Sequence, residues 1–123
     1  MDIQLLLQIF KNYSKGRKMF IQKIINDSWE VTYDNFSWLL ENKNYQNNKD
    51  FLDEDLLQIQ SLDRKYIIDV GWYPSFDPLG HFTLTLIKEM NWDSPLFEYS
   101  TVNLEELLKE ISDITTKREK TLY

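Results

Sequence analysis

Residues 66–114 read YIIDVGWYPSFDPLGHFTLTLIKEMNWDSPLFEYSTVNLEELLKEISDI, and this stretch decides the fold. Apolar side chains fall on every second position in residues 66–72 and again in residues 82–86, and a shorter run follows at Leu96–Ser100. This spacing is typical of strands, and the Pro, Gly, Asp and Asn residues between the runs are typical of turns. The pattern therefore predicts an antiparallel meander with one face packed and the other wetter.

The stretch ends in a segment whose pattern is helical. Asn103 is a typical N-terminal capping residue, and Glu106 three positions later completes a capping-box pattern. Five apolar residues then share one side of a helix, namely Leu104, Leu107, Leu108, Ile111 and Ile114. We expect this helix to lie across the sheet.

Two further strands are predicted before this stretch. Leu57 and Ile59 alternate with glutamines, and in residues 29–33 the side chains of Trp29, Val31 and Tyr33 fall on one face. Residues 19–25 form a short apolar run that reads as a strand paired with residues 29–33 in a hairpin. A helix over residues 17–25 is the alternative, because short apolar runs fit both structures.

The remaining segments complete the expected organisation. Residues 3–14 have helical spacing and stop before Gly16, which predicts an N-terminal helix packed on the domain rather than one on a membrane surface. Met19 is a second candidate start. Residues 36–40 suggest one helical turn, followed by a polar loop. We therefore expect one α+β domain over residues 1–123, with about five antiparallel strands, an N-terminal helix and a C-terminal helix. Its parts are a helical extension (1–18), a core (19–116) and a tail (117–123).

Composition limits the classes of protein to which the chain can belong. The 123 residues include no cysteine, which excludes disulfides and thiolate chemistry. No apolar run reaches the roughly 18–20 residues that span a bilayer, and the first residues turn basic only after their apolar part, unlike a signal peptide. We expect a soluble cytoplasmic protein. Residues 25–114 hold 18 acidic and six basic residues. This negative charge repels nucleic acid and attracts basic partners. The alternative is that the charge only keeps the domain soluble, because acidic soluble domains are common.

The sequence shows no recognisable catalytic, cofactor or metal set. His81 is the only histidine, the glycines are isolated, and the acidic run at residues 50–55 lacks the spacing of a calcium loop. Asp69 falls within a predicted strand, Asp77 in the loop after it, and Glu89 one strand further on; two such acids with Lys88 resemble a metal nuclease core only loosely. We therefore expect no enzyme, no cofactor and no metal. A pocket that gathered Asp69, Asp77 and His81 would favour an enzyme instead.

The segment Trp72–Gly80 is the best candidate for a contact surface. It is rich in aromatic residues and contains two prolines, which restrict its backbone. Exposed Trp and Tyr are favoured anchors of protein interfaces. The alternative is a hairpin turn whose aromatic side chains fold into the core.

Five blocks of this sequence carry a family resemblance. They are WEVTYDNF (29–36), IDVGWYP (68–74), DPLG (77–80), NWDSPL (91–96) and LEELLKEI (104–111). Together they resemble small bacterial immunity proteins, the antitoxins encoded beside polymorphic and contact-dependent growth-inhibition toxins. The resemblance covers residues 29–115, and residues 1–18 have no counterpart in it.

The resemblance implies a cytoplasmic protein that binds the C-terminal toxin domain of its cognate effector and blocks it, without catalysis. Many such toxins are basic nucleases, which an acidic surface with aromatic anchors would suit. No nucleic-acid or membrane partner is expected.

The alternative function is a general acidic interaction module or a nucleic-acid mimic. The candidate toxin contacts are Asp50, Asp53, Glu54, Asp55, Tyr73, Phe76 and Asp77.

Overall fold

The computed structural model describes residues 18–40 and 49–116. The predicted helix at 3–14, most of the polar loop after residue 40, and the tail at 117–123 lie outside the described residues. The elements run in the order α2 (Lys18–Ile24), β1 (Trp29–Asp34), α3 (Phe36–Leu40), η2 (Lys49–Phe51), β2 (Leu57–Ser61), β3 (Tyr66–Tyr73), β4 (His81–Lys88), β5 (Phe97–Thr101) and α4 (Leu104–Thr116).

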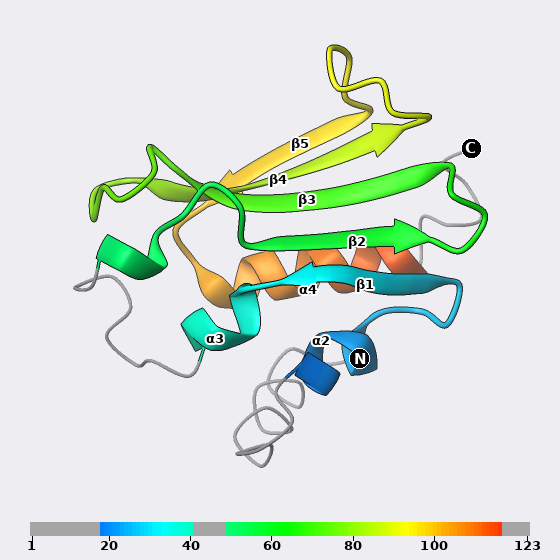
Figure 1. Cartoon of the computed structure of the whole chain (residues 1–123), viewed down its shortest axis with the longest axis horizontal. Helices are drawn as coiled ribbons and strands as arrows, with labels where there is room; N and C mark the ends of the chain where they lie inside the picture. The colour runs from blue at the N-terminus through cyan, green and yellow to red at the C-terminus, as the bar shows by residue number, and fades with distance from the viewer. Residues whose placement is uncertain (1–17, 41–48, 117–123) are drawn as a thin grey trace.

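The five strands form one antiparallel sheet in the order of the chain, β1-β2-β3-β4-β5 (Figure 1). This arrangement confirms the predicted α+β class with a meander sheet. Every neighbour in the sheet is also a neighbour in sequence. The β2–β3, β3–β4 and β4–β5 connections are turns or short loops, whereas the β1–β2 connection spans residues 35–56 and contains α3 and η2.

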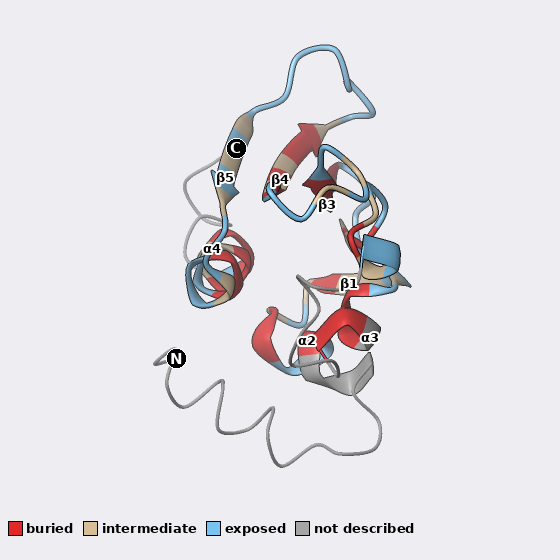
Figure 2. Cartoon of the chain, turned by 90° about the vertical axis from the view of Figure 1, so that its left-hand side faces the viewer, coloured by how far each residue is buried: buried red, intermediate tan, exposed pale blue. Residues whose placement is uncertain are grey.

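The helices α2, α3 and α4 lie on the same, concave side of the sheet (Figure 2). The α4 stripe is buried there, with Leu107, Leu108, Ile111 and Ile114 all at 0% exposure. These residues meet the inner sheet row that runs from Ile59 through Ile68 to Leu86. Burial of the two apolar faces against each other is the main stabilising term of such a layer. Within residues 18–40 and 49–116, no helix combines the length and the apolar character needed to cross a membrane.

The interpretation of residues 19–25 as a strand is wrong, and the alternative of a helix is correct. Ile21, Ile24 and Ile25 are all buried, at no more than 6% exposure. Ile21 and Ile24 are three positions apart and share one side of the helix, and Ile25 follows directly after its end. A strand would turn Ile24 and Ile25 to opposite faces. The helix α2 thus covers the lower end of the core (Figure 1).

Tyr33 lies on the face of the sheet opposite to the one predicted. The β1–β2 register shifts between Val31 and Tyr33, so that Val31 still pairs with Ile59 but Tyr33 pairs with Gln58. An extra residue of this kind is a β-bulge, which reverses the faces of the residues beyond it. Tyr33 is consequently exposed at the end of a polar row that continues across the sheet through Gln58, Asp69, Thr85 and Glu98.

The start of α4 is capped as predicted, but its capping box is only half formed. The Asn103 side chain accepts the N–H of Glu106 at 3.0 Å. The Glu106 carboxylate does not return to Asn103; it accepts the hydroxyls of Tyr99 at 3.0 Å and Thr101 at 2.8 Å. The Asn103 N–H donates instead to the Thr101 hydroxyl oxygen at 3.0 Å, and Glu106 ties α4 to β5.

Candidate protein-binding surface

The acidic residues before β2 are held along the end of β3. The N–H of Leu56 donates to the Val70 carbonyl at 3.0 Å, and the N–H of Trp72 donates to the Asp53 carbonyl at 2.8 Å. Gly71 lies between these two bonds, and a Cβ there would overlap the carbonyl oxygen of Glu54. The glycine is thus required for this close approach, which fixes Asp53, Glu54 and Asp55 over β3.

The turn after β3 is fixed to the same segment. The N–H of Phe76 donates to the Leu52 carbonyl at 2.6 Å. The Phe76 backbone adopts a positive φ of 61°, which is uncommon for a residue with a bulky side chain. Its ring nevertheless remains 49% exposed. The surrounding hydrogen bonds therefore hold an apolar side chain at the surface in a strained conformation.

The predicted alternatives for Trp72–Gly80 each hold for part of the segment. Trp72 belongs to the core at 0% exposure, and its indole N–H donates to the Asp77 carbonyl at 2.6 Å. Tyr73 and Phe76 are exposed. The Asp77 carboxylate accepts the N–H of Leu79 at 2.9 Å, so this side chain helps to shape the turn.

Five predicted contact residues converge on one surface, which we call the acidic–aromatic patch: Asp53, Glu54, Asp55, Tyr73 and Phe76. The Tyr73 hydroxyl lies 3.5 Å from the Glu54 carbonyl oxygen. Partial burial and then the charges of Asp69, Glu54, Asp55 and Asp53 raise the pKa of Tyr73. The acidic residues therefore act together on the Tyr73 hydroxyl. Asp50 is exposed in the preceding η2 turn.

A recess adjoins the patch on the face opposite to α4, and we call it the Asp69 recess. It has a volume of about 270 Å³ and is lined by Tyr33, Asp55, Leu57, Gln58 and Asp69. Burial, joined by the charge of Asp55, raises the pKa of Asp69, and a long 3.4 Å hydrogen bond from Gln58 offsets this only in part. Sequence reasoning missed Tyr33 as a site residue because the bulge in β1 has no distinct sequence signal. It missed Gln58 because the alternation in β2 does not show which residues of β1 and β3 lie beside it.

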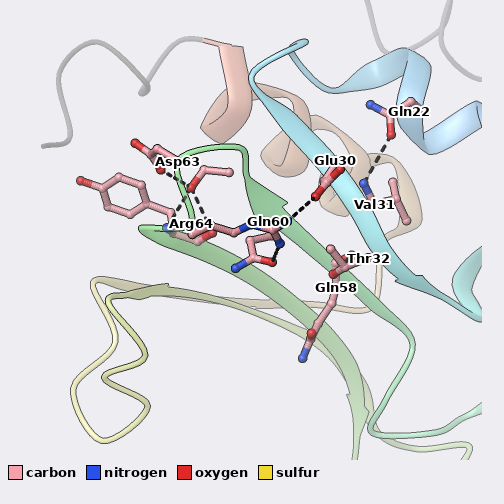
Figure 3. Close-up of polar contacts among 10 residues, drawn as sticks. Gln22, Glu30, Val31, Thr32, Gln58, Gln60, Asp63 and Arg64 are labelled. Atoms are coloured by element: carbon pink, nitrogen blue, oxygen red, sulfur yellow. Dashed lines mark hydrogen bonds and ion pairs between the residues drawn. The ribbon is translucent and has the colours of Figure 1, made fainter.

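The patch and the recess lack cationic partners within the described residues. There, no Lys or Arg side chain pairs with Asp53, Glu54, Asp55 or Asp69. The ion pair between Arg64 and Glu30, with 3.6 Å between nitrogen and oxygen, lies beside the β2–β3 turn, at the other end of the sheet (Figure 3). The local field at the patch is therefore negative and favours a positively charged partner.

The geometry does not assemble the residues considered for catalysis. The Asp69 recess contains neither Asp77 nor His81. The His81 ring lies at the start of β4, with its Nδ1 atom 3.3 Å from the Thr83 hydroxyl. Among residues 18–40 and 49–116, no three His, Cys, Asp or Glu side chains are placed to hold a metal ion.

A second and larger recess lies between the turns at the other end of the sheet. It has a volume of about 570 Å³ and is lined by Asp27, Ser28, Trp29, Ser61, Leu62, Asp63, Lys65 and Tyr66. Asp63 accepts the Lys65 N–H and the Ser61 hydroxyl, which hold the pKa of its carboxyl below the usual range. The indole N–H of Trp29 is buried and has no acceptor within residues 18–40 and 49–116. Charges of both signs line this recess, so it shows no preference for a basic partner.

Comparison with protein-family models, with curated proteins and with solved structures found no match to this chain.

Proposed function

We propose that this chain is an immunity protein that acts in the cytoplasm, where it binds a cognate toxin domain, most simply a basic nuclease, and neutralises it without catalysis. One observation carries the proposal: two segments chosen separately as contact candidates, Asp53–Asp55 and Tyr73–Phe76, lie side by side on one surface. They are joined by the hydrogen bonds of Trp72 to Asp53 and of Phe76 to Leu52.

The chemistry of this surface suits a tight complex with a basic protein. Exposed carboxylates speed the encounter with a positive partner, and partly exposed aromatic rings supply contact area once water is excluded. The Phe76 backbone is held by its hydrogen bond to Leu52, and Tyr73 is the last residue of β3, so little backbone freedom is lost on binding. The resemblance of residues 29–115 to immunity proteins supports the same assignment.

The test is the affinity for the toxin domain encoded immediately upstream, measured by isothermal titration calorimetry. The patch variant carries Asp53→Asn, Glu54→Gln and Asp55→Asn. The control carries Asp27→Asn, Glu89→Gln and Asp93→Asn, which changes the net charge equally at exposed positions elsewhere. We expect the patch variant to raise Kd at least about tenfold, equivalent to about 1.4 kcal/mol. The control should stay within about twofold of the wild type.

Two results would contradict the proposal. The first is no binding of the upstream toxin by the folded wild-type protein. The second is an equal loss of affinity in both variants, which would attribute binding to net charge alone and favour a general acidic interaction module. Retention of full affinity by the patch variant would reject the acidic–aromatic patch as the contact surface.

A further inference from the structure

The turn between β3 and β4 presents apolar side chains that the core does not use. It runs from Pro74 to Gly80 and projects at the left end of the sheet (Figure 1). Leu79 is 92% exposed, more than any other large apolar residue in the described part of the chain, and Phe76 is 49% exposed in the same turn. One exposed leucine is ordinary, but two bulky apolar side chains on one short turn form a candidate contact.

The backbone around Leu79 is tied to the buried indole of Trp72. The Trp72 indole N–H and the Gly80 N–H both donate to the Asp77 carbonyl, at 2.6 Å and 3.0 Å. The Asp77 carboxylate accepts the N–H of Leu79 at 2.9 Å. A Cβ at Gly80 would lie 2.5 Å from the Tyr73 carbonyl oxygen, so a larger residue would displace this backbone. Leu79 therefore stands on an ordered turn, and its burial by a partner costs little backbone freedom.

The charges around this turn limit what can cover its apolar side chains. Residues 66–80 contain Asp69 and Asp77 and no Lys or Arg, and the acidic residues at 53–55 lie against the end of β3. Such a surface repels the anionic headgroups of a lipid surface and the phosphates of a nucleic acid. A protein with an apolar hollow that is rimmed by Lys or Arg would satisfy both the apolar side chains and the carboxylates.

We propose that Leu79 anchors the interface with the toxin domain by entering an apolar hollow whose rim carries Lys or Arg, with Phe76 against the edge of that hollow. The inference rests on the proposed function and deepens it. It adds a residue outside the acidic–aromatic patch and names the chemistry of the toxin surface that this residue meets. Asp77 is then a positioning residue, because its carboxylate accepts the Leu79 N–H.

The acidic and the apolar parts of this interface act on different rate constants. The carboxylates at residues 53–55 attract a basic partner over a distance and speed association, an effect that salt screens. The Leu79 side chain acts only on contact, so its removal speeds dissociation and leaves association nearly unchanged. The exclusion of water from an apolar side chain is not screened by salt. Salt dependence therefore separates the two contributions.

The test is surface plasmon resonance of the full chain with the toxin domain encoded immediately upstream, at about 0.05 M and about 0.3 M salt. Leu79→Ala should speed dissociation at least about tenfold at both salt concentrations. Leu79→Met keeps the apolar volume and should stay within about threefold of the wild type. Leu62→Ala is the matched control and should stay within about twofold. Leu62 is an exposed leucine too, at 56%, but it lies in the β2–β3 turn at the other end of the sheet.

Thermal unfolding of the free chain should be unchanged in all three variants, because both leucines are exposed. The inference is overturned if Leu79→Ala dissociates at the wild-type rate or if Leu62→Ala dissociates as fast as Leu79→Ala. It is also overturned if the effect of Leu79→Ala disappears at the higher salt concentration, which would make the contact ionic. Absence of toxin binding by the folded wild-type protein would instead reject the proposed function, and this inference with it.

Discussion

Trp29 and Trp72 are both almost fully buried, but among the described residues Trp72 has an acceptor for its indole N–H and Trp29 has none. A buried donor without an acceptor costs stability, whereas a made hydrogen bond contributes roughly 1 kcal/mol. Trp72 also packs edge-on against Phe82, with ring centroids 4.9 Å apart. The two tryptophans therefore offer a matched comparison of one buried hydrogen bond.

We expect Trp72→Phe to reduce the free energy of unfolding by about 1 kcal/mol more than Trp29→Phe, since both lose similar apolar area but only the first loses a hydrogen bond. Urea unfolding of both variants, with unchanged dependence on denaturant, measures the difference. Equal losses would show that the contact between Trp72 and Asp77 contributes nothing.

Asp69 is a carboxyl whose ionisation opposes folding. Its pKa is raised in the folded protein, chiefly by burial, so the folded state binds more protons than the unfolded state between the unfolded pKa of about 3.9 and the folded pKa. Stability therefore falls as pH rises through this window and stays lower above it. The negative charge beside the acidic–aromatic patch therefore lowers stability at neutral pH.

We expect Asp69→Asn to raise the free energy of unfolding at pH 7 by roughly 0.3–1 kcal/mol, a modest gain because solvent screens the half-buried carboxyl. The gain should shrink towards zero below the unfolded pKa, where the wild-type carboxyl is neutral in both states. Denaturant titrations at pH 3.5 and pH 7 would provide the check. A gain that is the same at both pH values would refute the ionic origin.

At the scale of elements, strands 66–73 and 81–88 and helix 104–116 could be predicted closely, because long alternation and a clear cap leave few alternatives. The helix at 18–24 could not be separated from a strand, since seven residues satisfy both patterns until the packing partner is known. The bulge in β1 could not be predicted either. It arises from the register between β1 and β2, and the local sequence of β1 does not specify that register.

The cap of α4 gives a test of local structure. Replacing Asn103 by Ala removes the acceptor for the Glu106 N–H and should cost about 1 kcal/mol of stability. Asn103→Asp keeps an acceptor and should cost much less. Thermal and urea unfolding of the two variants would measure this contrast. Equal losses would mean that the side-chain oxygen does not stabilise the helix start.

At the scale of the whole molecule, the sequence predicted which residues could bind a partner but not how they meet. Asp53 and Tyr73 are twenty residues apart, and only the bonds over Gly71 bring their segments together. The Asp69 recess was not predictable because Tyr33 joins it through the bulge. Tertiary pairing, rather than local sequence, thus creates the surface on which the proposed function depends.

The most direct measurement of that function is growth of cells that express the upstream toxin domain together with this chain. Wild-type protein and the control variant at residues 27, 89 and 93 should both restore growth. The patch variant at residues 53–55, expressed at the same level, should restore it poorly. Cells that die despite folded wild-type protein, or that grow equally well with all three proteins, would contradict the account.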